Sequence, residues 1–256
     1  MKSSREMILA LVVKYKGNWS KVYSAIQNKD YPEEDYVEKV ANEYKDKYIT
    51  ILDNEYPEYL KQGYQPPFVL FYEGHINLLK DKNYKKIAIN DSKKVSTEDK
   101  MVAKEILSNV PEDIAFVLGG EGVMSEYVAK NYSNPIIMVL AYSPEQYGYV
   151  GLKQRIIQNG GVILSEYPSS AFIELSNEHF LNRYRIMATI SEKVLLLTSS
   201  PKTSGANIMV CIALSQGKDI LTVPVSPLNT ESANNQYIYE GAIPIYNNLT
   251  LCDNLN

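Results

Sequence analysis

The chain has 256 residues, of which 45% are hydrophobic and 22% charged, and its formal net charge at pH 7 is -4. This composition is typical of a globular protein with a large core, and it excludes the long-range positive field that attracts polyanions from a distance. The two cysteines, Cys211 and Cys252, are not at metal-ligand spacing, and no apolar run approaches the ~20 residues that span a bilayer, so we expect a cytoplasmic protein without disulfides, zinc or membrane contact.

The first 47 residues show the apolar spacing of helices. Two amphipathic stretches are separated by the Gly17-Asn18 break, and a third opens at Tyr31-Pro32 with Pro32 at its first position and ends near Tyr44. We therefore predict a small amino-terminal helical unit over residues 1–47, of the SAM or helix-hairpin kind, which packs on the rest or contacts partners.

From Tyr48 to the end, short apolar runs alternate with helical patterns. This is typical of an α/β domain with a mostly parallel sheet covered on both faces, here a core domain over residues 48–256. In such sheets ligands bind beyond the carboxyl ends of the strands. The tail from Asn247 is polar and is expected to fray. The predicted strands are 68–74, 86–90, 114–120, 135–141, 161–167, 193–200 and 219–225, and the predicted helices are 97–109, 122–132, 149–159, 179–190 and 206–216.

One predicted strand runs directly into Ser92, Lys93 and Lys94, and a helix follows at Ser96 or Thr97. Helix amides and lysines both favour an anion, so this turn is a candidate phosphate site. A solvated turn with a well-capped helix explains the same residues equally well.

A glycine-rich turn at the end of another strand contains Gly119, Gly120 and Gly122. These glycines could bring the backbone close to a nucleotide. However, the last glycine of a G-x-G-x-x-G pattern counted from Gly120 is Ser125, and Glu121 repels phosphate. A tight structural turn is therefore the favoured interpretation.

A third candidate anion site is made of residues that precede and follow the strand 193–200. Arg183 and Arg185 precede it, and Lys202 and the Ser204-Gly205 helix start follow it. Arginines clamp phosphates and free helix amides hold anions, although two snorkelling arginines on an ordinary helix are the simpler explanation.

Nothing in the sequence assigns catalysis. His75 and His179 belong to no metal or nucleophile motif, and no acid and base can be paired. We expect no enzymatic activity, no metal and no cofactor.

Six stretches, taken in order, resemble the DprA/Smf family of DNA-processing proteins over about residues 50 to 245. They are YPEYLKQGYQPPFVLFYEG (56–74), IAINDSKKVS (87–96), GGVILSEYP (160–168), FLNRYRIMATIS (180–191), KTSGANIMVCIALSQGKDILTVP (202–224) and NNQYIYEGAIPI (234–245). The resemblance implies a Rossmann-like core whose basic pocket holds single-stranded DNA.

By the same resemblance, Lys93, Arg183 and Arg185 would face phosphate, with Lys94 and Lys202 beside them. The implied function is to protect incoming DNA and to assist RecA loading in natural transformation, with single-stranded DNA and RecA as partners and a homodimer as the assembly. The chain departs from the family pattern where Asp91 replaces a glycine and around the 118–129 turn. The alternative is a divergent Rossmann-like member that binds a nucleotide or a protein and does not bind DNA.

Overall fold

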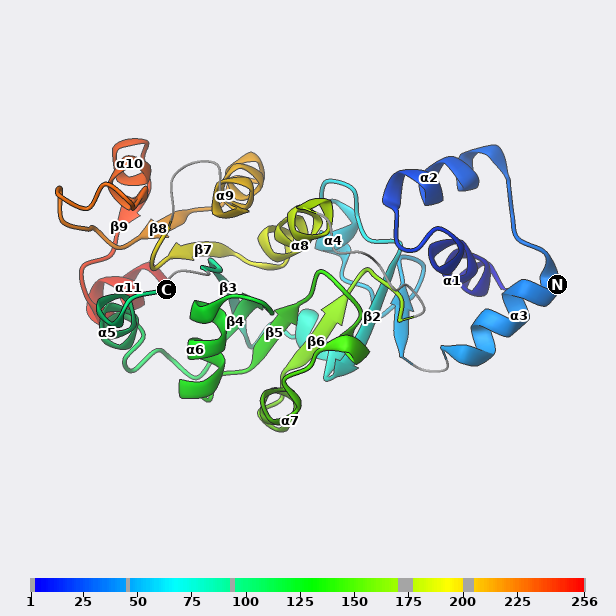
Figure 1. The fold of residues 1–256 in the computed structure, drawn as a ribbon, viewed down its shortest axis with the longest axis horizontal. Helices are drawn as coiled ribbons and strands as arrows, with labels where there is room; N and C mark the ends of the chain where they lie inside the picture. The colour runs from blue at the N-terminus through cyan, green and yellow to red at the C-terminus, as the bar shows by residue number, and fades with distance from the viewer. Residues whose placement is uncertain (1–2, 45–46, 93–94, 170–176, 200–204, 256) are drawn as a thin grey trace.

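The computed structural model describes residues 3–44, 47–92, 95–169, 177–199 and 205–255. Within these ranges, nine strands form one sheet in the order β1-β2-β6-β5-β4-β3-β7-β8-β9. Helices cover both faces of the sheet, and a helical unit lies against the β1–β2 end (Figure 1). The strands are β1 (Tyr48–Thr50), β2 (Val69–Gly74), β3 (Lys85–Ile89), β4 (Ile114–Gly119), β5 (Ile136–Val139), β6 (Val162–Ser165), β7 (Lys193–Leu196), β8 (Ile220–Thr222) and β9 (Ile243–Pro244).

The α/β class and the mostly parallel sheet are confirmed. Every strand from β6 to β9 in the sheet order runs parallel to its neighbours, whereas β1 and β2 pair antiparallel with each other, and β2 with β6. All seven predicted strands form. The sequence did not predict the short edge strands β1 and β9.

Strand residues alternate between two apolar layers. In β3, Ala88 faces one layer, while Ile87 and Ile89 face the other. The Ala88 layer packs on α4 (Glu58–Lys61), η1 (Ile76–Leu79), α8 (Asn177–Ile190), α9 (Gly205–Ser215) and α10 (Asn234–Tyr239). The opposite layer packs on α5 (Thr97–Ile106), α6 (Val123–Asn131), α7 (Val150–Gln158) and α11 (Asn248–Leu255), and η2 (Pro144–Gln146) leads into α7.

The carboxyl-terminal tail is helical, so the expectation that it frays is wrong. Leu251 and Leu255 on α11 are buried in the same apolar layer as α5. These two leucines, four residues apart, give an otherwise polar segment one apolar face.

The amino-terminal helices are α1 (Ser4–Lys14), α2 (Trp19–Asn28) and α3 (Glu34–Glu43). Gly17 has a φ of 74°, which glycine adopts at little cost, and the Asn18 side chain caps α2, so the predicted break is confirmed. However, α3 begins at Glu34, after Pro32, which places two acids in its first turn.

This helical unit shares an apolar cluster with the sheet. Tyr48, Val69 and Phe71 are buried together with residues of α1, α2 and α3. The Trp19 Nε1 donates to the Pro66 carbonyl at 2.8 Å, and Arg5 pairs with Asp53 at 2.9 Å. The division into domains at residues 47 and 48 stays a prediction, and the structure shows an apolar core that extends across it.

The strand order changes direction at β3. The chain proceeds from β3 through β4 and β5 to β6 on one side, and then α8 returns it to β7 on the other side of β3. Such a switch point leaves a crevice at the carboxyl ends of the two central strands. In the described part of the chain, no helix is both long and apolar enough to cross a membrane.

Candidate functional site

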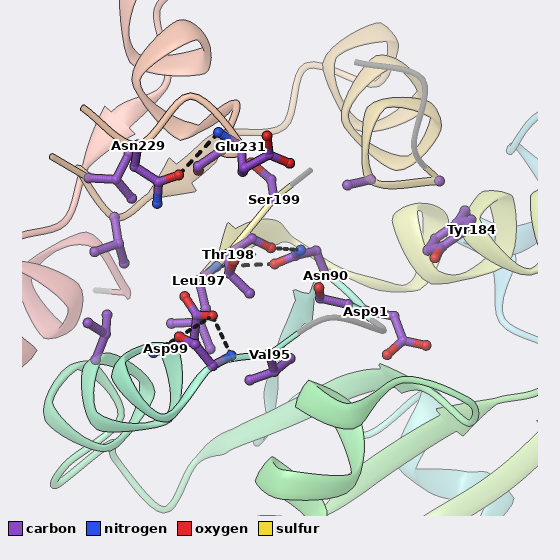
Figure 2. A pocket seen from close by; sticks show the side chains of 18 of the residues that line it. Asn90, Asp91, Val95, Asp99, Tyr184, Leu197, Thr198, Ser199, Asn229 and Glu231 are labelled. Carbon is purple, nitrogen blue, oxygen red and sulfur yellow. Dashed lines mark hydrogen bonds between the residues drawn. The ribbon is translucent and has the colours of Figure 1, made fainter. Parts of the chain in front are cut away.

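A cavity of about 1510 Å³ lies at this switch point, beyond the carboxyl ends of β3, β7 and β8. Figure 2 shows Asn90, at the end of β3, beside Thr198, at the end of β7, with Asp91 and Ser199 farther along the two segments. The first turns of α5 and the start of α9 complete the walls. The position agrees with the expectation that a ligand of this fold binds at the carboxyl edge of the sheet.

An asparagine ties the two central strand ends together. Asn90 Oδ1 accepts from the Leu197 amide at 3.1 Å, and Asn90 Nδ2 donates to the Thr198 carbonyl. Because both ends of the amide bond to the backbone, Asn90 fixes the cavity floor.

A second asparagine does the same on the far wall. Asn234 Nδ2 donates to the Val223 carbonyl at 2.8 Å, and Asn234 Oδ1 accepts from the Ser199 hydroxyl. Ser199 also accepts, through its carbonyl, from the Ala233 amide at 3.1 Å. These bonds connect β7, β8 and α10 into one wall. Both asparagines lie in stretches that resemble the family, but the sequence analysis assigned neither to the site.

Arg183 lies in the cavity wall and is directed at carboxylates. Its side chain is 2% exposed, its Nη2 lies 3.3 Å from Asp91 Oδ2, and Nη1 contacts Glu121 Oε2. One guanidinium thus faces two carboxylates, so the cluster carries net negative charge. The predicted contact of Arg183 with phosphate stays a prediction.

Arg185 lies elsewhere, because two positions along α8 rotate the side chain by about 200°. Its Nη2 donates to both Glu166 oxygens at 2.7 and 2.6 Å, and Nη1 donates to the Gln65 carbonyl. Burial raises the pKa of the Glu166 carboxyl, and the adjacent Arg185 opposes that shift. Arg185 does not line the cavity, so its predicted phosphate contact finds no support in this geometry.

The glycine turn is filled by protein atoms. A Cβ at Gly122 would overlap the Asp91 carboxylate, and a Cβ at Gly120 would overlap Leu140. At Gly119, a Cβ would lie 2.8 Å from Asp91 Oδ2. The first amide of α6 donates to the Ser92 carbonyl at 2.9 Å. The geometry therefore favours the tight structural turn over the nucleotide turn.

The remaining predicted residues divide into two groups. Ser92 and Gly205 both line the cavity, and Gly205 is required there because a Cβ would overlap the Tyr184 ring. Lys93, Lys94, Lys202 and Ser204 lie outside the described residues.

Acidic side chains that the sequence did not assign to a site also line the cavity. Glu98 and Asp99 come from the first turn of α5, and Glu231 comes from the loop before α10. Asp99 accepts from the Ser96 amide and hydroxyl at 2.8 Å each, which confirms the predicted cap. Among the described lining residues, four thus carry carboxylates (Asp91, Glu98, Asp99 and Glu231) and one carries a guanidinium (Arg183).

Comparison with known proteins identifies relatives of this chain. Residues 47–256 match the family model described as DNA recombination-mediator protein A. The DNA processing protein DprA of Streptococcus pneumoniae is 27% identical over 202 residues, which are 76% of this chain and 69% of that protein. The chain spans between 59% and 69% of the length of the curated relatives it matches.

Two solved structures share the fold. The X-ray structure of Streptococcus pneumoniae DprA superposes with a TM-score of 0.78 and 21% identity, covering 99% of this chain and 98% of that chain. Helicobacter pylori DNA processing protein A, whose structure was described for its single-stranded DNA binding mode, gives a TM-score of 0.68 and 22% identity over 81% of this chain and 95% of that one. At these identities the two structures establish the fold alone.

Proposed function

The chain belongs to the DNA recombination-mediator protein A family of DNA-processing proteins, and from this membership we propose that it binds single-stranded DNA without enzymatic activity. The family match over residues 47–256 carries the proposal. The cavity of about 1510 Å³ at the topological switch point supports it, because it offers a recess large enough for bases at the edge of the sheet where this fold binds ligands.

The charges around the cavity determine how DNA would be held. Four carboxylates and Arg183 give the described lining a negative balance, so phosphates are held away from its acidic walls. We expect the phosphate contacts to come from Lys93, Lys94 and Lys202, which follow the ends of β3 and β7 in the sequence. Affinity would then fall steeply with salt, because each neutralised phosphate releases counterions.

The first experiment is a fluorescence anisotropy titration of labelled poly-dT at low and at moderate salt. We expect Lys93→Ala/Lys94→Ala to weaken binding and to reduce the slope of log affinity against log salt by up to about 1.4, or about 0.7 for each phosphate that the variant no longer neutralises. The matched control is Lys104→Ala/Lys130→Ala, which removes the same charge from exposed positions of α5 and α6 outside the cavity lining.

Two outcomes decide this proposal. Equal losses of affinity in the two double variants would assign the effect to net charge alone and would remove Lys93 and Lys94 from the site. No binding by the unaltered chain at low salt would overturn the proposed function.

Dimerisation and RecA contact are further parts of the proposal, and both rest on the family resemblance. Light scattering across a concentration series tests for a homodimer. Loading of purified RecA onto DNA coated with single-strand-binding protein, with and without this chain, tests for assistance. A monomer that leaves RecA loading unchanged would restrict the function to DNA binding.

The acidic lining weighs against DNA phosphates in the cavity. The alternative is a member of the family that does not bind DNA and instead holds a nucleotide or a protein segment. A thermal-shift screen of nucleotides against the unaltered chain tests the first version. A ligand at 100 times its Kd would stabilise the fold by about 2.7 kcal/mol. A nucleotide that stabilises the chain while poly-dT does not bind would establish this alternative.

A further inference from the structure

The outer surface of α2, which the cavity does not involve, has features of a nucleic-acid contact. Figure 1 shows α2 at the end of the molecule opposite β8 and β9. Val22 and Ala25 bury one side of the helix. At 100° per residue, the rest of the helix surface has two parts. Trp19 and Tyr23 form an aromatic flank, and next to it Ser20, Ser24, Asn28 and Lys21 form a polar flank.

The aromatic flank is a stack of three rings. Trp19 lies between Phe68, at a centroid distance of 5.4 Å, and Tyr23, at 4.9 Å with an interplanar angle of 12°. Hydrogen bonds hold both α2 rings in place, from Trp19 Nε1 to the Pro66 carbonyl at 2.8 Å and from Gln27 Nε2 to the Tyr23 hydroxyl at 2.7 Å. Tyr23 ends the stack and is 42% exposed.

The Trp19 contact with Phe68 and its bond to the Pro66 carbonyl attach α2 to the loop before β2. Tyr23 lies on the outer side of the helix, whereas Val22 and Ala25 are buried on its inner side. A rigid, flat ring presented to solvent at the end of a stack is the kind of surface on which unpaired bases stack.

The polar flank is a shallow hollow of about 330 Å³. It is lined by Tyr15, Ser20, Lys21, Ser24, Ala25, Asn28 and Asp30. Hydroxyl, amide and ammonium groups are the donors that proteins use on nucleic-acid phosphates. The one carboxylate is already engaged, because it accepts from the Tyr15 hydroxyl at 3.1 Å and lies 3.9 Å from Lys14 Nζ.

The local charge is opposite to that of the whole chain. Residues 7–29 contain four lysines (Lys14, Lys16, Lys21 and Lys29) and no acidic residue, in a chain whose net charge is -4. All four lysines are exposed. Since Lys14 lies 3.9 Å from Asp30, the other three lysines give the turn before α2, its polar flank and its carboxyl end a positive balance, which attracts a polyanion at short range.

We propose that these two flanks of α2 form a second contact surface for single-stranded DNA. A base stacks on the exposed face of Tyr23, and the adjoining phosphates lie along Ser20, Ser24 and Lys21. The proposal rests on the proposed function, which supplies the ligand, and it concerns a surface separate from the cavity.

The chain offers a direct probe, because Trp19 is its single tryptophan. Saturating the full chain with poly-dT at low salt should change the Trp19 emission, since a base stacked on Tyr23 lies one ring away. Anisotropy of the labelled oligonucleotide, recorded in the same samples, measures binding independently. The Lys93→Ala/Lys94→Ala variant, which leaves α2 intact, should still show the emission change once saturated.

Variants of α2 distinguish a base stacked on Tyr23 from DNA that binds elsewhere and changes the Trp19 emission indirectly. Tyr23→Ala should weaken poly-dT binding at least about fivefold, and Tyr23→Phe should stay within about twofold of the unaltered chain, because stacking needs the ring and not the hydroxyl. Lys21→Ala should reduce the salt slope by about 0.7. Tyr31→Ala removes another exposed ring, 49% exposed and outside this surface, and should leave affinity unchanged.

The outcomes distinguish this inference from the proposed function. Binding by anisotropy, with unchanged Trp19 emission and an unchanged affinity in Tyr23→Ala, would overturn the α2 surface and leave the proposed function intact. No binding by anisotropy at low salt would overturn both. Circular dichroism of each variant confirms that the helices remain folded.

Discussion

Asp91 lies between the Arg183 guanidinium and the glycine turn, and it explains why residue 122 is glycine. Gly122 has a φ of -96°, which any residue adopts, so only the overlap with the Asp91 carboxylate excludes a side chain. We expect Gly122→Ala to lower the free energy of unfolding by about 1–3 kcal/mol. In an Asp91→Gly background the same change should cost under about 1 kcal/mol, as measured by urea denaturation. Equal costs in both backgrounds would contradict this account.

Asp91 also sets the charge of the cluster around Arg183. In Asp91→Gly, Arg183 keeps Glu121 as its partner, so the cluster becomes neutral. We expect poly-dT affinity at low salt to rise by about tenfold, the effect of removing one charge about 10 Å from a phosphate at an effective dielectric near 20. The gain should shrink as salt is added. Asp113→Asn, an exposed change outside the cavity, is the control for net charge.

Arg185 and Glu166 form a buried ion pair, and we expect the loss of one partner to cost more stability than the loss of both. Arg185→Met leaves the Glu166 carboxylate buried without its bidentate partner, so we expect it to lower the free energy of unfolding by about 3–5 kcal/mol. Arg185→Met/Glu166→Leu should recover most of that stability. If the folded double variant loses poly-dT affinity, Arg185 has the phosphate role that the sequence analysis predicted.

At the scale of elements, Lys218 caps the carboxyl end of α8. Its Nζ donates to the Ala188 and Thr189 carbonyls at 2.7 and 2.9 Å, and burial lowers its pKa from 10.5 to about 8. Between pH 8 and 10 the unfolded chain therefore holds more protons at this lysine than the folded chain does. The free energy of unfolding should rise with pH across this window relative to Lys218→Met. Parallel pH profiles for the two proteins would contradict this.

The sequence predicts the seven inner strands and misses the two edge strands. The strand 114–120 is observed as Ile114–Gly119, because a continuous apolar run of that length is typical of a strand in a sheet covered on both faces. β1 has three residues and β9 has two, too few to show any periodicity. Their pairing depends on partners distant in the chain, such as Phe71 for β1 and Leu221 for β9.

Residues of the site that follow strand ends could be predicted from the sequence, whereas contacts between distant segments could not. Ser92 and Gly205 were expected at the ligand edge, and both line the cavity, because the ends of parallel strands meet at one edge. The partners of Arg183 were not predictable, since Asp91 and Glu121 come from other segments and meet it only in the folded chain.

At the scale of the whole molecule, the helical unit and the sheet depend on each other. Tyr48, Val69 and Phe71 are at most 4% exposed, and α1–α3 cover them. We expect residues 48–256 alone to lose several kcal/mol of stability, at about 1.5–3 kcal/mol for each large side chain uncovered, and to bind a hydrophobic dye. A denaturation midpoint equal to that of the full chain would show that the two parts are independent.

The order of the strands also determines how the protein would respond to mechanical force. β1, at one edge of the sheet, follows the amino-terminal helices, and β9, at the other edge, leads into the carboxyl-terminal α11. Tension between the two ends would therefore act across the strands and load their hydrogen bonds one ladder after another, as in opening a zipper. β9 is held to β8 through two residue pairs, Leu221 with Ile243 and Thr222 with Pro244, so it would detach before the longer ladders at the centre of the sheet.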